Sequence, residues 1–545
     1  MAFFRFLSLM LGLATLSSAA EKLDRGLVAV SAGPGKVHVS WRWLSSDKPG
    51  VAFDVYRRVG GGRPVKVNRQ PITKTTDFMD ESAPSGAEYS VGGEFVTSAP
   101  YVRIPFRGHY SAQSVAIADL DGDGKLDFVV KQPAINIDPW EKYWRKSPGT
   151  FRLEAYRHDG QPLWQYDLGW AIEQGVWYSP FVVYDFDGDG KAEVAVKTGE
   201  GDPRDRDGRV QTGPEYLTVL DGETGKPICR AGWPERELFA EEGYNRASRN
   251  QLCVAYLDGK TASLVIDRGT YKRIVIEAWQ YRGRKLQRQW RWDNRELPKE
   301  YIGQGSHMLQ AADVNGDGRD EIVVGSCVLS PDGRELWTTG LGHPDSVYIG
   351  KLDPSRDGLQ IYYNIETRQK CNGMCMVEAA TGKILWGYDK PTKHIHSFGL
   401  CSDIDPSRPG WECYGADSAD HKFLCSWLWD CQGRLLSDKL DWGFGLRTVY
   451  WDADPQRELI RNKRLTKYNG PEVGEIEGQL IAVADILGDW REEILTTVDG
   501  ELRIYSTPIP ATDRRPCLLQ DPMYRRCVAR QTSGYYQCPT LRDPP

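Results

Sequence analysis

A nine-residue acidic segment that occurs three times constrains the fold more than any other feature. The copies are Asp119-Leu-Asp-Gly-Asp-Gly-Lys-Leu-Asp127, Asp185-Phe-Asp-Gly-Asp-Gly-Lys-Ala-Glu193 and Asp313-Val-Asn-Gly-Asp-Gly-Arg-Asp-Glu321. Carboxylates or amides occupy positions 1, 3, 5 and 9, and the glycines let the loop curl so that several oxygens converge on a hard cation. A short apolar strand follows each copy, where an EF-hand would require a helix. Three copies in register favour calcium loops over ordinary surface turns.

These loops predict Ca²⁺, with several ions bound, as the cofactor of the chain. The residues expected at the ions are those of the loops themselves: Asp119, Asp121, Asp123, Lys125 and Asp127; Asp185, Asp187, Asp189, Lys191 and Glu193; Asp313, Asn315, Asp317, Arg319 and Glu321.

Charge and aromatic content limit the classes of partner. The 545 residues carry a net charge of -6 and contain no basic block, which argues against nucleic acid as the main partner. The 19 Trp and 26 Tyr suit a carbohydrate groove, although in a β protein most aromatic residues fill the core.

The N-terminus has the pattern of an export signal. Arg5 precedes an apolar stretch from Leu7 to Leu16, and Ser18-Ala-Ala20 forms a small-residue cleavage site. We therefore expect a signal peptide over residues 1–20 and a secreted mature chain that begins near Glu21. The apolar stretch is too short to span a membrane, and no later segment approaches the roughly 20 apolar residues required. We expect a monomer without a membrane span.

Twelve cysteines fit an oxidising compartment, and their even number allows full pairing. Three pairs are close enough in sequence to be local disulfides, although spacing does not fix connectivity: Cys371/Cys375, Cys425/Cys431 and Cys517/Cys527. Zinc is the competing interpretation, which the lack of any Cys-x-x-Cys pair disfavours.

The chain divides into a small β module over residues 21–100 and a repeat region over 101–545. Residues 37–41, 53–56 and 88–91 alternate as half-buried strands, and the lone Trp41 suggests a sandwich that resembles a fibronectin type III module. From residue 101, units run from an acidic loop through an apolar strand to a hairpin ending in Trp164, Trp337 or Trp386. Degenerate units near residues 256, 351, 403, 450 and 484 bring the total to about eight, which predicts an all-β propeller. The inserts 132–155, 200–215 and 231–250 are expected over one face, where sites usually lie.

Eight strings are spread over nearly the whole mature chain: Val129-Val-Lys131, Ala195-Val-Lys197-Thr198, Gly303-Gln-Gly-Ser-His307, Gly342-His343-Pro-Asp345, Asp403-Ile-Asp-Pro, Gly488-Asp-Trp-Arg-Glu-Glu493, Asp521-Pro-Met-Tyr524 and Tyr535-Tyr-Gln-Cys-Pro539. Together they resemble the family 11 rhamnogalacturonan lyases, and the string from Gly488 to Glu493 is the most specific. The resemblance implies a secreted, calcium-loaded, eight-bladed propeller. It also implies cleavage of rhamnose–galacturonate linkages, as in rhamnogalacturonan I of pectin, by β-elimination.

β-Elimination sets the residue types that such a site requires. The enzyme removes the weakly acidic C5 proton beside a uronate carboxylate and expels the C4 oxygen. A cation such as Ca²⁺, Arg or Lys must neutralise the carboxylate, and a base of suitable pKa must take the proton. A glycoside hydrolase would instead need two carboxylates flanking the bond, and the abundant acidic loops leave no single pair to nominate.

Position and resemblance supply the catalytic candidates Lys131, Lys197, His343 and Arg464. Lys131 and Lys197 each follow the last residue of a calcium loop by four positions, so they form either a clamp for uronates or two solvated strand ends. His343 and Asp345 could hold a metal over the channel or simply form a hydrogen-bonded turn. His307 matches a family position, with a buried structural histidine as the alternative. The base is left open.

The same matching suggests that Asn136, Asp159 and Tyr535 bind the sugar, and Lys463 is a further substrate-binding candidate in a turn that departs from the family pattern. Asp159 also lies in an Asp-Gly hairpin, where a role in the turn is sufficient explanation.

Two departures from the family pattern put the substrate in question. His394-Ile-His-Ser-Phe-Gly399 stands where relatives have Asp-Val-Gly-Arg-Gly, so the arginine becomes Phe398, and Arg461-Asn-Lys-Arg464 replaces an Asn-Gly-Thr turn. His394 and His396 supply a metal site, a base or a solvated loop.

The departures keep two alternatives open beside a rhamnogalacturonan I lyase. One is a lyase for another rhamnose–uronate polysaccharide, such as one with glucuronate. The other is a non-catalytic propeller that binds glycans or proteins, which would have no use for the clustered Lys, His and Arg turns.

Overall fold

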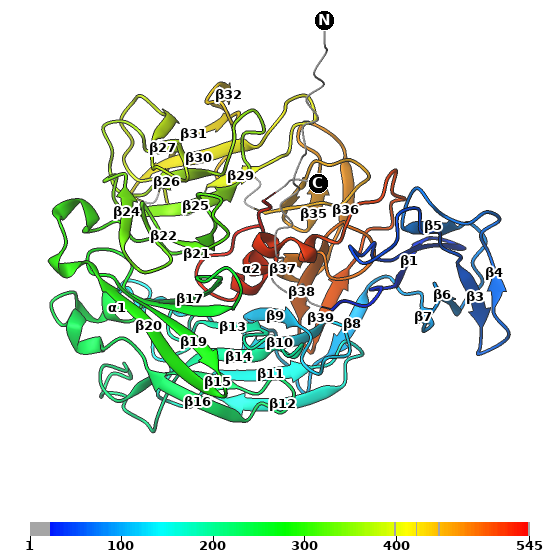
Figure 1. Cartoon of the computed structure of the whole chain (residues 1–545), viewed down its shortest axis with the longest axis horizontal. Coiled ribbons are helices and arrows are strands. Elements are labelled where there is room, and N and C mark those ends of the chain that lie inside the picture. Colours follow the sequence, from blue (N-terminus) through cyan, green and yellow to red (C-terminus); the bar gives the residue numbers. More distant parts are fainter. Residues whose placement is uncertain (1–21, 397–398, 421, 445–446, 543–545) are drawn as a thin grey trace, which may run out of the picture.

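Nearly all regular structure of the chain is β-strand, as the sequence predicts. The computed structural model describes residues 22–396, 399–420, 422–444 and 447–542 (Figure 1). The expected signal peptide and Phe398 lie outside these residues. The helical elements among them are short: α1 (Gly243–Ala247), α2 (Pro522–Arg530) and the 3-10 turns η1 (Arg236–Phe239), η2 (Asn294–Glu296), η3 (Lys299–Tyr301) and η4 (Leu518–Gln520). No helix in the described ranges is long and apolar enough to cross a membrane.

Eight four-stranded antiparallel sheets make up the described chain from residue 102 onward. The first four contain β9 (Ser114–Ala118), β10 (Asp127–Gln132), β11 (Arg152–Tyr156) and β12 (Pro162–Asp167); β13 (Phe181–Tyr184), β14 (Glu193–Gly199), β15 (Glu215–Leu220) and β16 (Pro227–Gly232); β17 (Asn250–Ala255), β18 (Ser263–Arg268), β19 (Val275–Arg282) and β20 (Lys285–Asp293); β21 (Leu309–Ala312), β22 (Glu321–Val324), β23 (Cys327–Leu329) and β24 (Glu335–Thr338). The next three contain β25 (Pro344–Gly350), β26 (Gln360–Ile365), β27 (Met374–Glu378) and β28 (Ile384–Gly387); β29 (Leu400–Ser402), β30 (Glu412–Ala419), β31 (Lys422–Trp429) and β32 (Leu435–Ser437); β33 (Thr448–Val449), β34 (Glu458–Arg461), β35 (Arg464–Thr466) and β36 (Glu472–Glu475).

The eighth sheet joins the two ends of the repeat region. It consists of β37 (Gln479–Ala484), β38 (Glu493–Val498), β39 (Glu501–Tyr505) and the early strand β8 (Val102–Pro105). The first strands of successive sheets lie side by side at β9 and β13, β13 and β17, β17 and β21, and β25 and β29, while β37 returns to β9. Helix α2 packs against β9, β13, β17 and β21, near the middle of the molecule in Figure 1.

Antiparallel order separates the connections into two faces. One face, here called the loop face, carries the connections between first and second strands, which include the acidic loops 119–127, 185–193 and 313–321. The other, here called the insert face, carries the connections between second and third strands and the links between sheets. The long segments 133–151, 200–214 and 233–249 all lie on the insert face.

Tryptophans at the hairpins join neighbouring sheets. Trp164 Nε1 donates a hydrogen bond of 2.7 Å to Gly222 O, and Trp337 Nε1 donates one of 3.0 Å to Ala379 O. A Cβ atom at Gly382 would meet the Trp337 ring at 2.5 Å, so only glycine fits beneath the indole. The repeated Trp and Gly of the hairpins are therefore two halves of one contact between sheets.

The N-terminal residues form two further sheets, β1 (Val28–Gly33), β2 (Lys36–Ser40) and β5 (Asp77–Asp80), and β3 (Tyr56–Val59), β4 (Val65–Lys66), β6 (Ala87–Ser90) and β7 (Val96–Thr97). Trp41, Val55 and Tyr89 are fully buried between them. The two sheets dock on the eighth sheet and the first acidic loop, because His38 Nδ1 lies 3.0 Å from Thr507 O and Asp24 N donates to Gly124 O.

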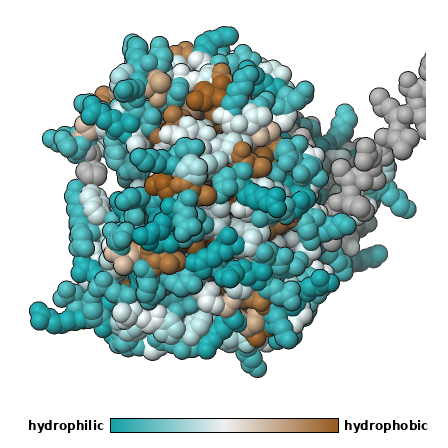
Figure 2. Space-filling view, turned by 60° about the vertical axis from the view of Figure 1, so that its left-hand side comes forward, coloured by the Kyte–Doolittle hydropathy of each residue, from teal (hydrophilic) through white to brown (hydrophobic). Residues whose placement is uncertain are grey.

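The side of the molecule in Figure 2 is mostly polar. Figure 2 shows a largely hydrophilic side with hydrophobic residues in scattered patches.

The three expected local cysteine pairs are not bonded, and all twelve thiols are free. Cys401 and Cys413 face each other across β29 and β30 with their sulfurs 3.4 Å apart.

Candidate functional site

Six side chains of types that can bind a metal ion gather on the insert face above the fourth to sixth sheets. They form two groups of three, and in each group the ligand atoms lie within 4.8 Å of one another: His307, His343 and Asp345; Glu366, His394 and His396. His307, His343, His394 and His396 come from links between sheets, Asp345 comes from the start of β25, and Glu366 directly follows β26. The fold thus unites His343 and Asp345 with His307 and with the two histidines that depart from the family pattern.

His343 is oriented as a metal ligand would be. Its Nδ1 lies 2.5 Å from Gly305 O and 3.1 Å from Thr270 O, so this nitrogen must carry the proton. Its Nε2 then points a lone pair at two carboxylates, 3.1 Å from Asp345 Oδ1 and 3.2 Å from Glu366 Oε2. A lone pair that faces two carboxylates requires a proton or a cation between them.

The charges of the buried carboxylates support a cation here. Burial alone would raise the pKa of Asp345, yet its hydrogen bond with His343 and the nearby His307 hold that pKa below its usual range. Burial and the charge of Asp345 together raise the pKa of Glu366. The donor set of His307, His343, Asp345 and Glu366 therefore fits a divalent cation.

Aromatic rings surround His307. Its ring centroid lies 4.5 Å from that of Tyr535 and 4.8 Å from that of Trp177, and the Tyr271 hydroxyl lies 3.0 Å from its Nε2. Burial lowers the pKa of His307 well below its usual value, so the imidazole is neutral near pH 7. Burial raises the pKa of Tyr271, so its hydroxyl keeps its proton and can donate it.

Two arginines of the segment 233–249 flank these rings. The guanidinium of Arg246, in α1, lies 3.8 Å from the Tyr271 ring centroid, and it forms no ion pair with any other described residue. Arg249 is buried, lies 5.0 Å over Trp177 and pairs with Asp138 at 2.9 Å. Arginines are natural carboxylate binders, so this wall suits an acidic sugar.

Sequence reasoning missed Arg246, Arg249, Tyr271, Trp177 and Glu366. The only signal for the arginines was their position in the insert 231–250, which was expected over the functional face. Glu366 and Tyr271 had no pattern that distinguished them from other polar loop residues.

Lys131 lies at the end of β10, fully buried. Its Nζ donates to Ser179 O at 2.9 Å and lies 5.2 Å from the ring centroids of Phe151 and Phe181. Burial lowers its pKa to about 7. Lys131 is thus neither a solvated strand end nor open to a ligand in this conformation.

Lys197 occupies the equivalent position on β14 and is likewise buried. Its Nζ pairs with Glu215 at 2.6 Å, and Arg236 and Arg268 contact the same carboxylate. Burial lowers the pKa of Lys197 to about 8, although the charge of Glu215 opposes the shift. Arg236 belongs to the segment 233–249, so this ion cluster anchors the segment that carries Arg246.

The four expected sugar-binding residues are divided between the two faces. Asn136 lies on the insert face and accepts a hydrogen bond of 2.9 Å from Val176 N, beside Trp177, and Tyr535 packs on His307. Asp159 lies on the loop face, where it accepts from Gln161 N at 3.0 Å and pairs with Arg157, an arrangement that supports a role in the turn. Its hydrogen bond with Arg157 lowers its pKa to about 2.

Lys463 and Arg464 lie in the hairpin between β34 and β35, on the insert face. Lys463 has a φ of 77°, and Arg464 pairs with Glu472 at 3.3 Å with two thirds of its side chain exposed. Both side chains are accessible to solvent. They lie on the seventh sheet, whereas the histidine cluster lies above the fourth to sixth sheets.

The three acidic loops have the geometry expected of calcium loops. Asp119 accepts two hydrogen bonds from backbone N–H groups of its loop, and Asp185 and Asp313 accept three each, which curls the chain about the carboxylates. Burial, aided by neighbouring carboxylates, raises the pKa of Glu193 to about 8 and that of Glu321 to about 7. A cation would relieve this repulsion, so the loops fit Ca²⁺.

One degenerate unit carries an ammonium group at its acidic cluster. Asp452, Asp454 and Glu458 of this unit form an acidic triad. Lys467 Nζ lies 2.5 Å from Asp452 and 3.9 Å from Glu458, and it also contacts Asp454. The lysine thus neutralises carboxylates that correspond to the expected calcium ligands of the complete loops.

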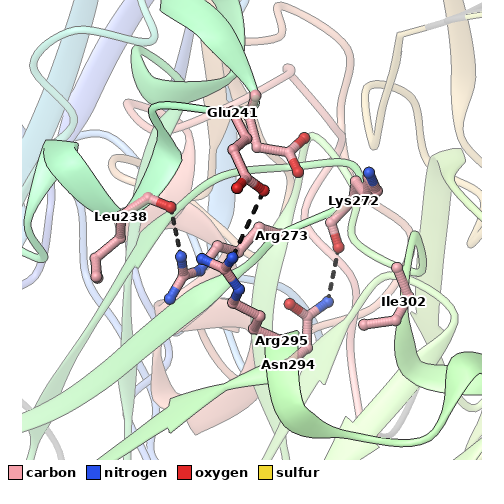
Figure 3. Close-up of a pocket in the computed structure, with 8 residues that line it drawn as sticks. Leu238, Glu241, Lys272, Arg273, Asn294, Arg295 and Ile302 are labelled. Atoms are coloured by element: carbon pink, nitrogen blue, oxygen red, sulfur yellow. Dashed lines mark hydrogen bonds and ion pairs between the residues drawn. The ribbon is translucent and has the colours of Figure 1, made fainter.

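A pocket of about 240 Å³ opens beside the Tyr271–Lys272 turn, between η1 and the segment that follows β20 (Figure 3). Among its lining residues, Arg295 pairs with Glu241 at 3.5 Å, and the Asn294 amide donates a hydrogen bond of 2.9 Å to Lys272 O.

Two family models match the chain. The model described as rhamnogalacturonan lyase family 11, C-terminal domain, matches residues 106–542. The model described as rhamnogalacturonan I lyases beta-sheet domain matches residues 18–96.

Similar proteins of known sequence or structure span almost the whole chain. The rhamnogalacturonan endolyase YesW of Bacillus subtilis is 36% identical over 581 residues, which cover 95% of the chain and 90% of the relative. The rhamnogalacturonan exolyase YesX of the same organism is 34% identical, with 95% and 94% covered. Solved structures of YesW and of a Bacillus licheniformis rhamnogalacturonan lyase each superpose with a TM-score of 0.86 at 34% identity, covering 96% of the chain and 97% of theirs.

Proposed function

The chain belongs to the family 11 rhamnogalacturonan lyases and is a polysaccharide lyase, and we propose that it cleaves the rhamnose–galacturonate backbone of rhamnogalacturonan I by calcium-assisted β-elimination. The observation that carries the proposal is the joint position of His343, Asp345 and Glu366 beside Arg246 and Tyr271 on the insert face. This arrangement supplies a cation site, a carboxylate-binding guanidinium and a proton donor within one site.

Each group has a role in the proposed reaction. A calcium ion held by His307, His343, Asp345 and Glu366 would neutralise charge on the uronate carboxylate. Arg246 binds the same carboxylate, and a base that is left unassigned takes the C5 proton. The C–H electrons form the C4=C5 double bond as the C4–O bond breaks, and Tyr271, which burial keeps protonated, donates its proton to the leaving C4 oxygen. The exposed aromatic surface of Tyr535 and the amide of Asn136 hold the neighbouring sugars.

The lysines act farther from the reacting bond. We assign Lys131 and Lys197 positioning roles, since each is buried and already bonded, and Lys197 anchors the segment that carries Arg246 through Glu215. Lys463 and Arg464, exposed on the same face, bind carboxylates of more distant galacturonates.

The proposal extends to the architecture. The eight sheets act as the blades of one propeller over residues 101–545, which β8 closes by pairing with β39. The three- and four-stranded sheets of residues 21–100 form a fibronectin type III-like sandwich that braces the closure. Residues 1–20 direct secretion, and the mature chain binds several Ca²⁺ ions and acts as a monomer.

Product mass tests the reaction type. Rhamnogalacturonan I is digested with the full mature chain, and the oligosaccharides are weighed by mass spectrometry. β-Elimination leaves an unsaturated galacturonate, so each new non-reducing end is lighter by one water than the product of hydrolysis. Products with the mass of hydrolysis, or no products, would overturn the proposal.

A further inference from the structure

Glu366, His394 and His396 form a group of their own beside the proposed calcium site. His394 Nε2 lies 3.5 Å from Glu366 Oε1, and the two imidazole centroids are 5.2 Å apart. About a third of each imidazole side chain is exposed, whereas Glu366 is mostly buried. The group is therefore accessible to an ion from solution.

The separation of His394 Nε2 and Glu366 Oε1 is that of two ligands around one ion, and a ligand atom of His396 lies within 4.8 Å of ligand atoms of both residues. The 3.5 Å between His394 Nε2 and Glu366 Oε1 is at the limit of a hydrogen bond. Two ligands at about 2.0–2.1 Å from a tetrahedral ion are separated by about 3.3–3.4 Å. The observed separation thus leaves room for an ion between the two atoms.

The kind of ligand distinguishes this group from the acidic loops. Calcium takes about six to eight oxygen ligands, and the loops on the opposite face supply carboxylates and an amide. The proposed calcium site has two carboxylates, Asp345 and Glu366, beside its two imidazoles. Here two imidazole nitrogens accompany only one carboxylate, which the calcium site also uses, and this nitrogen-rich combination suits zinc, nickel or cobalt. We propose that Glu366, His394 and His396 form a second metal site, which binds a divalent transition-metal ion of the zinc class rather than calcium.

Glu366 connects this site to the first one. Its Oε1 faces His394 and its Oε2 lies 3.2 Å from His343 Nε2, so one carboxylate serves both positions. Two histidines and a glutamate leave a fourth position of a tetrahedral ion open. Resting on the proposed function, the ion would take a carboxylate oxygen of the uronate at this open position. It would thereby add positive charge beside the calcium site.

Zinc titration in the presence of calcium tests the site. The full mature chain is stripped with a chelator, saturated with Ca²⁺ to fill the oxygen-lined loops, and titrated with Zn²⁺ by isothermal calorimetry. The variant His394→Ala/His396→Ala should lose one equivalent of bound zinc, its affinity at this position falling by more than about 100-fold. His109→Ala, which removes an imidazole that is 95% exposed, is the matched control and should bind like the wild type.

Three readouts decide the inference. Thermal unfolding in calcium checks that the double variant is folded; if it is not, His394→Gln and His396→Gln singly serve the same comparison. Bound Co²⁺ should give the wild type visible absorption bands, which disappear when Zn²⁺ displaces the Co²⁺. The variants should show weaker bands. Equal zinc uptake by the wild type and the variants, or no uptake by the calcium-loaded wild type, would overturn the second site.

Cleavage of rhamnogalacturonan I is measured on the same preparations. Cleavage with calcium but without zinc uptake contradicts only the second site. Zinc uptake lost in the double variant, without any cleavage by the wild type, supports the second site and contradicts the proposed function.

Discussion

The Nε2 atom of His343 lies 3.1 Å from Oδ1 of Asp345, its neighbour but one in the chain. Pro344 stands between them at the start of β25, where the register with β26 shifts before Ser346. His343 directly precedes β25 and Asp345 lies at the register shift, and this strand start places His343 Nε2 within 3.2 Å of both Asp345 and Glu366. The candidate metal-binding group is thus tied to the first strand of the fifth sheet.

Replacing Arg246 by Met should weaken substrate binding. The variant loses the guanidinium over Tyr271 that we assign to the uronate carboxylate, and we expect kcat/KM on rhamnogalacturonan I to fall by about 10- to 100-fold, a value typical of one charged hydrogen bond. Steady-state kinetics measure the effect. Arg295→Met, which removes a guanidinium paired with Glu241, is the control and should retain wild-type kinetics. Equal kinetics in both variants would refute the assignment.

Replacing Lys131 by Met should stabilise the chain in a pH-dependent manner. Burial lowers the pKa of Lys131 from 10.5 to about 7, so the wild type loses stability as the pH falls from about 10.5 to about 7, where only the unfolded chain takes up the proton. Removing the amine removes this cost, and we expect Lys131→Met to be more stable at pH 7 by on the order of 1–3 kcal/mol.

Calorimetric unfolding in calcium at pH 7 and pH 10 measures this difference. The gain should shrink as the pH approaches 10.5, because the amine is then increasingly neutral in both states. An advantage that is constant with pH would contradict the buried, uncharged state of Lys131.

Replacing Lys467 by Met should expose an unneutralised acidic triad. Asp452, Asp454 and Glu458 would lose their common cation, and we expect a loss of about 1–3 kcal/mol of stability in chelator. Added calcium should restore part of this loss by occupying the vacated position. Lys36→Met, whose ammonium pairs with the exposed Glu81 outside the acidic loops, is the control. Denaturant unfolding with and without calcium gives the comparison, and a calcium effect equal to that of the control would argue against ammonium replacing the ion.

Replacing Trp337 by Ala should destabilise the junction between the fourth and fifth sheets. The buried indole covers Gly382 and donates to Ala379 O, so its loss should cost about 3–5 kcal/mol. Trp140→Ala removes an indole that is 38% exposed and should cost far less. Unfolding midpoints of the two variants test the contact, and similar midpoints would show that the hairpin tryptophans do not join the sheets.

The repeats could be predicted from the sequence because each one depends on residues that are close together in the chain. The acidic loops need glycines at fixed positions, and the hairpins end in tryptophan, so both stand out in one chain without reference to distant contacts. The structure adds that Trp337 and Gly382, from successive units, belong to a single contact.

The site was only partly predictable because it is assembled from links between sheets. His343 and Asp345 are close in sequence and were identified, whereas Glu366 and Tyr271 come from other connections and carry no motif. Lys131 and Lys197 were placed correctly at equivalent strand ends, yet sequence spacing could not show that Ser179 and Glu215 would bind their ammonium groups. Asp159 illustrates the reverse case, since alternation of the strands puts its hairpin on the loop face.

The most direct test of the account follows absorbance in the ultraviolet band of a 4,5-unsaturated uronate while the full mature chain acts on rhamnogalacturonan I. We expect a rise with calcium that a chelator abolishes and calcium restores, and we expect His343→Ala to reduce the rise strongly at the same calcium concentration. No rise from folded, calcium-loaded protein, or an equal rise in chelator, would contradict calcium-assisted β-elimination.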